Sequence, residues 1–119
     1  MRSFDQLRAI FCENVRGAQR IDYGSRESVR KANRCVDRYR KAAKQIGEQY
    51  PDRIPEFELL LSNDDSEISL CAAICLVELM PHNTQHEEFA KRVITKYMEH
   101  CDGAMRYGLG VWMEKHLTI

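Results

Sequence analysis

Hydrophobic residues cover nearly every face of the stretch from Asp64 to Pro81. The stretch opens with small polar and acidic residues, whose side chains can accept hydrogen bonds from the free amides at a helix start. It closes at Pro81, which cannot continue a helix without the loss of an amide hydrogen bond. A helix that is apolar nearly all round is normally buried on several sides. Since about 14 residues are too few to span a bilayer, the pattern predicts the central helix of a protein core.

Five further helices are indicated by apolar residues that recur at spacings of three and four. Capping residues, glycines and prolines mark their ends. They are expected from Ser3 to near Gly17, from Ser25 to Gly47, from Asp52 to Leu61, after Thr84 up to Asp102, and from Ala104 onward. In the last of them we expect some of Met105, Gly108, Val111 and Trp112 to be buried. No run alternates with period two strongly enough to predict a strand.

Six helices joined by short loops predict an all-α fold. At about 40 residues a pair, the helices favour three stacked antiparallel hairpins, which is typical of a HEAT or armadillo-like solenoid. A chain of 119 residues is expected to form one helical-repeat domain that spans residues 1–119. Because sequence identity between the three pairs is poor, a compact closed helical bundle is the alternative.

An ordered set of short motifs between residues 28 and 115 resembles a short HEAT-like bacterial family, the domain of unknown function number twenty-nineteen. The set consists of Ala32-Asn33-Arg34, Leu59-Leu60 followed by Asn63-Asp64, the Ile68…Ala72-Ala73…Leu76 run, and Gly103-Ala104…Leu109…Trp112. The chain departs from HEAT-like helices at Ser69, where an arginine is frequent, so no ion pair between repeats is expected there. The resemblance implies a helical-repeat fold and brings no catalytic residues.

Charge is divided unevenly along the chain, although the net charge is zero. Residues 1–53 contain 13 Lys and Arg against 7 Asp and Glu, whereas residues 54–119 contain 5 against 11. Such a division can create a dipolar surface that steers a charged partner. The alternative is that solvated helix faces differ in composition without a partner.

The five cysteines are an odd number, and all lie within helical patterns. This favours reduced, packed cysteines in a cytoplasmic protein over a disulfide framework. No long apolar segment follows the basic residue near the start, so no secretory signal is expected. We therefore predict a cytoplasmic protein that does not associate with a membrane.

Two pairs of residues with metal-ligating side chains stand four positions apart. Cys71 and Cys75 lie in the most apolar stretch, where a free cysteine is usually packed rather than ligating. His82 and His86 lack the HExxH arrangement, in which a general base accompanies two helical histidines. The sequence also contains no nucleophile elbow, phosphate-cradling loop or dinucleotide-binding motif. We therefore expect no enzyme activity, no metal and no cofactor.

The second predicted helix carries seven Lys and Arg residues within about 15 positions, a number that could neutralise several phosphates. Its single interleaved aromatic residue, Tyr39, belongs to the apolar stripe, so a base-stacking platform is missing. Zero net charge is also unlike most nucleic-acid-binding domains. Nucleic acid is therefore an alternative partner, for which Arg34, Arg38 and Lys41 are the expected contacts.

These patterns favour a non-catalytic protein-binding module. By analogy of size and class, we predict an immunity protein that neutralises a cognate bacterial toxin domain. The acidic excess of the second half would complement a basic toxin such as a nuclease and speed its association. The expected contact residues are Asp64, Asp65, Glu67, Glu87, Glu88 and Glu99. A nucleic-acid-binding protein and a self-associating structural subunit are the alternatives.

Overall fold

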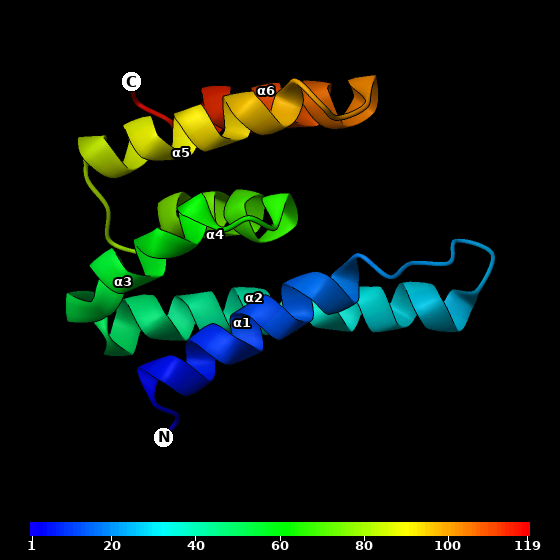
Figure 1. Cartoon of the computed structure of the whole chain (residues 1–119), viewed down its shortest axis with the longest axis horizontal. Coiled ribbons are helices and arrows are strands. Elements are labelled where there is room, and N and C mark those ends of the chain that lie inside the picture. The colour runs from blue at the N-terminus through cyan, green and yellow to red at the C-terminus, as the bar shows by residue number, and fades with distance from the viewer.

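The computed structural model describes all 119 residues as six α-helices, two short 3₁₀ helices and connecting loops (Figure 1). The α-helices are α1 (Phe4–Ala18), α2 (Arg26–Gln49), α3 (Ile54–Glu58), α4 (Ser66–Leu79), α5 (Thr84–Met98) and α6 (Gly103–His116). The 3₁₀ helices η1 (Pro51–Arg53) and η2 (Leu59–Ser62) flank α3. No strand is present, so the all-α fold with six helices that the sequence predicts is confirmed.

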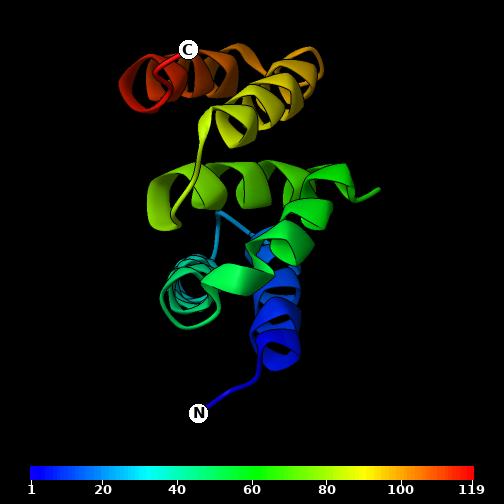
Figure 2. The ribbon, with the colours of Figure 1, turned by 90° about the vertical axis from the view of Figure 1, so that its left-hand side faces the viewer.

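The helices lie in layers, with α4 in the middle (Figure 1). On one side of α4, α1 and α2 form an antiparallel hairpin, and on the other side α5 and α6 run side by side. Figure 2, turned by 90°, shows the same order from the N-terminal hairpin to the C-terminal pair. The middle position explains why α4 has apolar residues on several faces.

Eight of the 14 residues of α4 are buried, and Ile68, Ala72 and Leu76 are fully covered. They belong to one hydrophobic core, to which α1, α2, α3, α5 and α6 also contribute. The prediction of a buried central helix between Asp64 and Pro81 is therefore confirmed. None of the helices combines the length and the apolar character that crossing a membrane requires.

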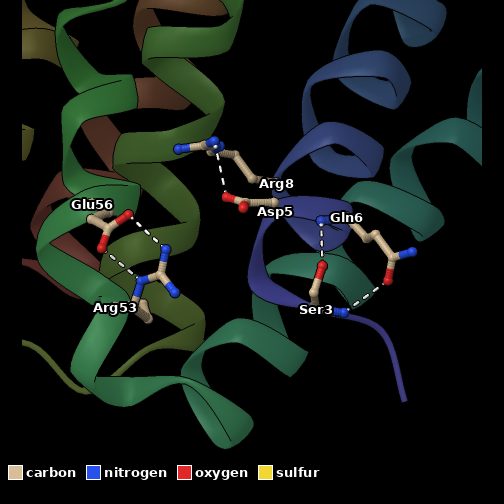
Figure 3. Close-up of polar contacts among 6 residues, drawn as sticks. All are labelled: Ser3, Asp5, Gln6, Arg8, Arg53 and Glu56. Carbon is tan, nitrogen blue, oxygen red and sulfur yellow. Dashed lines mark hydrogen bonds and ion pairs between the residues drawn. The ribbon is translucent and has the colours of Figure 1, made fainter.

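The helix starts follow the capping signals in the sequence. At α1, the Gln6 N–H donates to Ser3 Oγ at 3.1 Å, while the Ser3 N–H donates to Gln6 Oε1 at 2.8 Å (Figure 3). This capping box satisfies two amides that a helix start otherwise leaves free. Side chains of Ser25, Asp65, Asn83 and Asp102 cap the starts of α2, α4, α5 and α6. Local sequence therefore fixes where these helices begin.

Contacts of α1 with the segment after α2 attach the N-terminal layer to the rest of the core. The ring of Phe11 meets Phe57 edge-on, with centroids 5.2 Å apart. The guanidinium of Arg53 lies 4.5 Å from the ring centroid of Phe4 and forms a two-pronged ion pair with Glu56 at 2.6 and 2.8 Å (Figure 3). An aromatic pair and a cation–π contact thus hold α1 against η1 and α3.

The last turn of α2 passes very close to the end of α4. A Cβ atom on Gly47 would lie 3.0 Å from the carbonyl oxygen of Leu79 and 3.2 Å from Cα of Met80. Both neighbours are backbone atoms, which cannot move aside as a flexible side chain can. Glycine at position 47 therefore allows the close approach of the two helices.

The segment from Asp52 to Leu61 differs from the single helix that its apolar spacing predicts. It is divided into η1, α3 and η2. Pro51 and Pro55 each stand in the first turn of one of these pieces. Since proline lacks an amide hydrogen, it is tolerated at a helix start but not inside a helix. The two starts, four residues apart, separate η1 from α3, and no proline lies at the change from α3 to η2.

The buried face of α6 also differs from the prediction. Leu109 is the one buried residue of this helix, and Trp112 is half-buried. In contrast, Met105 and Val111 are 43% and 46% exposed, and no atom lies within 4 Å of a Cβ built on Gly108. The reason is that α6 is covered on one side only, by α5 and by the side chain of Glu78 on α4, so only a narrow face of it is buried.

Candidate functional site

A groove of about 740 Å³ lies between the segment from Leu61 to Ser69 and helix α5. One wall comes from the start of α4 and carries Asp64 and Glu67. The other wall comes from α5 and carries basic side chains and Tyr97. The two walls belong to neighbouring layers of the fold, so their separation is set by how α4 and α5 pack.

The acidic wall is positioned by a tight turn before α4. The N–H of Asp65 donates to Oδ1 of Asn63 at 2.9 Å. Oδ1 of Asp65 in turn accepts from the N–H groups of Glu67 and Ile68 at 2.9 and 3.3 Å. These bonds fix the backbone on both sides of Asp64, whose own side chain is exposed.

A single hydrogen bond joins the two walls. The hydroxyl of Tyr97 on α5 donates to Oε1 of Glu67 on α4 at 2.6 Å. Burial, together with this contact to a carboxylate, raises the pKa of Tyr97 above its ordinary value. The phenol therefore stays protonated and remains a donor, which holds Glu67 at the edge of the groove.

The α5 wall presents Arg92 and Lys96, which are four residues apart and therefore share one helix face, and His100 follows in the turn after the helix. The guanidinium of Arg92 lies 5.4 Å from the ring centroid of Phe89. Neither Arg92 nor Lys96 forms an ion pair within the chain. The groove thus has an acidic wall and a basic wall that do not neutralise each other by direct contact.

The structure separates the six acidic residues that the sequence suggests as a contact surface. Asp64 and Glu67 line the groove together. Asp65 caps α4 beside them, and its Oδ2 lies 3.9 Å from Nε of Arg16. The carboxylate of Asp65 is therefore already occupied by its hydrogen bonds to the start of α4 and by the nearby guanidinium of Arg16.

The other three acidic residues belong to α5 and its C-cap and do not line the groove. Glu88 and Glu99 are exposed. Glu87 is only 4% exposed, because its two carboxylate oxygens accept from the N–H and the hydroxyl of Thr118 at 2.8 and 2.9 Å. These two hydrogen bonds lower the pKa of Glu87. Glu87 is therefore a structural carboxylate that ties the C-terminal segment to α5, and the prediction that it contacts a partner is wrong.

Sequence reasoning missed the basic wall of the groove. Arg92 and Lys96 are four residues apart in a helical pattern, so the spacing itself carried the signal that they share a face. Nothing in the sequence indicated that this face lies opposite Asp64 and Glu67. That relationship depends on the packing of α5 against α4.

The cysteines of α4 have the character of packed thiols. Burial raises the pKa of Cys71 to about 11, although its hydrogen bond with the Tyr39 hydroxyl, at 3.7 Å, acts in the opposite direction. Burial also raises the pKa of Cys75, which is fully covered. All five cysteines are free. The thiolate is the form of cysteine that acts as a nucleophile or a metal ligand. Near neutral pH both thiols of α4 are protonated, so neither is suited to nucleophilic attack or metal binding.

The histidines at the start of α5 take part in local hydrogen bonds. Nδ1 of His86 accepts from the N–H of Asn83 at 3.1 Å, so its Nε2 carries the proton toward Glu58, 2.8 Å away. The ring of His82 contacts the carbonyl of Met80 at 3.0 Å. No group of three or more His, Cys, Asp or Glu side chains has a geometry that could hold a metal ion.

No protein-family model, curated protein or solved structure matches this chain. The resemblance to the short HEAT-like bacterial family therefore stays a prediction.

Proposed function

We propose that this chain is a non-catalytic protein-binding module that receives a segment of a protein partner in the groove between α4 and α5. The observation that carries the proposal is the pair of oppositely charged walls, Asp64 with Glu67 and Arg92 with Lys96. None of these four charges is used in an ion pair within the chain. A partner that brings a cation to one wall and a carboxylate to the other therefore gains both interactions. The half-buried ring of Phe89 adds apolar surface to the groove.

Within this function, we propose that the partner is a cognate bacterial toxin domain such as a nuclease, and that the chain is its immunity protein. A nuclease carries basic surface toward its substrate, because the phosphate backbone dominates nucleic-acid binding. The exposed carboxylates of Asp64, Glu88 and Glu99 would speed the association of such a partner. The step from a small helical module to immunity is an analogy of size and class. A cytoplasmic location would keep the five free cysteines reduced.

Co-expression with the product of the adjacent gene tests this proposal. We expect the chain to restore growth in cells that this product alone arrests, and we expect the two purified proteins to form an equimolar complex. A chain that neither restores growth nor binds the product would rule out immunity toward it. Binding without restored growth would support the protein-binding module and contradict neutralisation.

Charge reversal at each wall tests whether the groove is the contact. Asp64→Lys and Arg92→Glu should each weaken the complex by about tenfold, because each leaves one charge of the partner facing a like charge. The matched control is Asp37→Lys on α2, an exposed carboxylate with the same change of charge that does not line the groove. Equal effects of Asp64→Lys and Asp37→Lys would indicate long-range attraction instead of contact in the groove.

A second candidate function, nucleic-acid binding, is favoured by the exposed face of α2. Arg30, Arg34, Arg38 and Lys41 are exposed on this helix, and none of them forms an ion pair. Binding of a labelled DNA duplex or RNA strand at low salt would be expected to weaken steeply as salt is added. If neither probe binds at low salt, or if Arg34→Glu has no effect on binding, this candidate is wrong.

A further inference from the structure

The groove between α4 and α5 has an apolar floor. None of its four apolar lining residues is exposed: Leu61 is buried, and Phe89, Val93 and Tyr97 are half-buried. Phe89, Val93 and Tyr97 follow one another at spacings of four, so they form a row along one side of α5. Over eight residues of helix, this row is about 12 Å long. The floor can therefore receive apolar side chains over about two turns of a partner helix.

Charged side chains form rims of opposite sign beside this floor. On the α4 side, Asp64 is exposed and Glu67 is half-buried. On the α5 side, Arg92 and Lys96 are exposed, and each precedes a residue of the apolar row by one position. The groove thus matches a segment that has apolar residues in the middle, cations on one flank and anions on the other.

The walls of the groove are poor partners for the backbone of an extended segment. They are built from helices and the short segment before α4, and no strand edge is present. The backbone N–H groups at the start of α4 are already used within the chain, among them those of Asp65, Glu67, Ile68 and Ser69. An extended segment binds chiefly through main-chain hydrogen bonds, so its buried amides would find few partners here. A helix satisfies its own backbone and presents only side chains.

We propose that the segment received by the groove is an amphipathic α-helix of the partner. Its apolar face lies on the floor, its cations lie beside Asp64 and Glu67, and its anions lie beside Arg92 and Lys96. This inference rests on the proposed protein-binding function and specifies the secondary structure and the charge pattern of the bound segment. The rims also fix the direction of the helix. Turning it end to end exchanges its flanks and would place like charges together.

Fluorescence anisotropy with a labelled synthetic peptide tests the helix. A probe of about 18 residues is long enough to form a helix, with leucines on one face, lysines on one flank, glutamates on the other and alanines facing outward. We expect it to bind the unchanged full chain. Replacement of one central, outward-facing alanine by proline should weaken binding by about 100-fold, because proline breaks a helix. An extended segment would tolerate the same change, since this position faces away from the groove.

Charge reversal on both sides of the contact tests the rims. Asp64→Lys and Arg92→Glu should each weaken binding of the probe by about tenfold. A second peptide, with glutamates on both flanks, should respond in the opposite way and bind Asp64→Lys more tightly than the unchanged chain. The matched control is Asp37→Lys, which changes an exposed carboxylate of α2 that does not line the groove. It should leave the affinity of both peptides nearly unchanged.

Three results would overturn the proposal. The first is a probe that does not bind at concentrations up to about 1 mM. The second is equal affinity of the probe and its proline variant, which would indicate an extended segment. The third is an equal effect of Asp64→Lys and Asp37→Lys, which would place the contact elsewhere. If the chain still forms a complex with the product of the adjacent gene, the protein-binding function stands and only the helix is wrong. If that complex is also missing, both proposals are wrong.

Discussion

The indole Nε1–H of Trp112 on α6 donates to Oε1 of Glu78 on α4 at 2.6 Å. Oε2 of the same carboxylate accepts from Arg40 of α2 at 2.7 Å. One carboxylate thus connects helices from all three layers of the fold. Burial alone would raise the pKa of Glu78, but the hydrogen bonds from Trp112 and Arg40 and the charge of Arg40 together lower it.

Trp112→Phe should destabilise the protein by about 1 kcal/mol or somewhat more, because it keeps most of the ring and removes the donor to a carboxylate. Glu78→Gln should have an effect of similar size, since it removes the charge that faces Arg40. Urea denaturation measures both free energies of unfolding. The control is Glu88→Gln on the exposed surface of α5, which we expect to change stability by no more than about 0.5 kcal/mol. Equal losses in all three variants would contradict a specific role for Glu78.

Two alanine substitutions at helical glycines should have opposite effects. Gly47→Ala should destabilise the protein by about 1–3 kcal/mol, because its Cβ would press on the backbone of Leu79 and Met80. Gly108→Ala should stabilise the folded protein by about 1 kcal/mol, because helix propensity improves and no atom is displaced. Thermal unfolding compares the two. A stabilising Gly47→Ala would show that α2 and α4 are farther apart than described.

Protonation of Glu87 should lower the stability of the folded protein in acid. The pKa of this carboxyl is lower in the folded chain than its ordinary value of 4.5, because Thr118 donates two hydrogen bonds to the charged form. Its stabilising contribution is therefore present above that ordinary value and disappears as the pH falls through the lower folded-state pKa. Unfolding temperatures measured from neutral pH into this range should decline less steeply for Glu87→Gln than for the unchanged chain. An identical decline in both proteins would contradict a depressed pKa at Glu87.

Thiol modification should be slow at α4 in the folded protein. Cys71, with a pKa of about 11, and the fully covered Cys75 are almost entirely protonated near neutral pH. Iodoacetamide reacts with thiolates, so peptide mass spectrometry should find both residues unlabelled until the chain is unfolded. Fast labelling of Cys71 in the folded protein would mean that its environment is more open or more electropositive than the contact with Tyr39 indicates.

Local signals in the sequence were enough to predict the helix that organises the fold. The cap at Asp65 and the break at Pro81 depend on a few neighbouring residues, and the apolar faces of α4 follow from spacing along one element. The same reasoning predicted a helix start at Ser3, where a capping box forms, and the start of the last helix at Ala104, one residue after the observed start at Gly103. It failed for the segment from Asp52 to Leu61, which is divided into η1, α3 and η2.

For the groove, in contrast, the sequence indicated the residues of only one wall. Asp64 and Glu67 were expected at a surface, but the basic residues opposite them, Arg92 and Lys96, were not. Glu87 looked like its neighbour Glu88, yet a contact with Thr118, far along the chain, buries it.

The sequence by itself determined the five longer helices, their capped starts and the burial of α4, because these follow from hydrogen bonding and side-chain spacing within each segment. Only the tertiary structure decided which carboxylates are free, which walls form the groove and which face of α6 is left open. Each of these depends on the neighbours that an element acquires when the layers pack together, and spacing along the chain does not specify those neighbours.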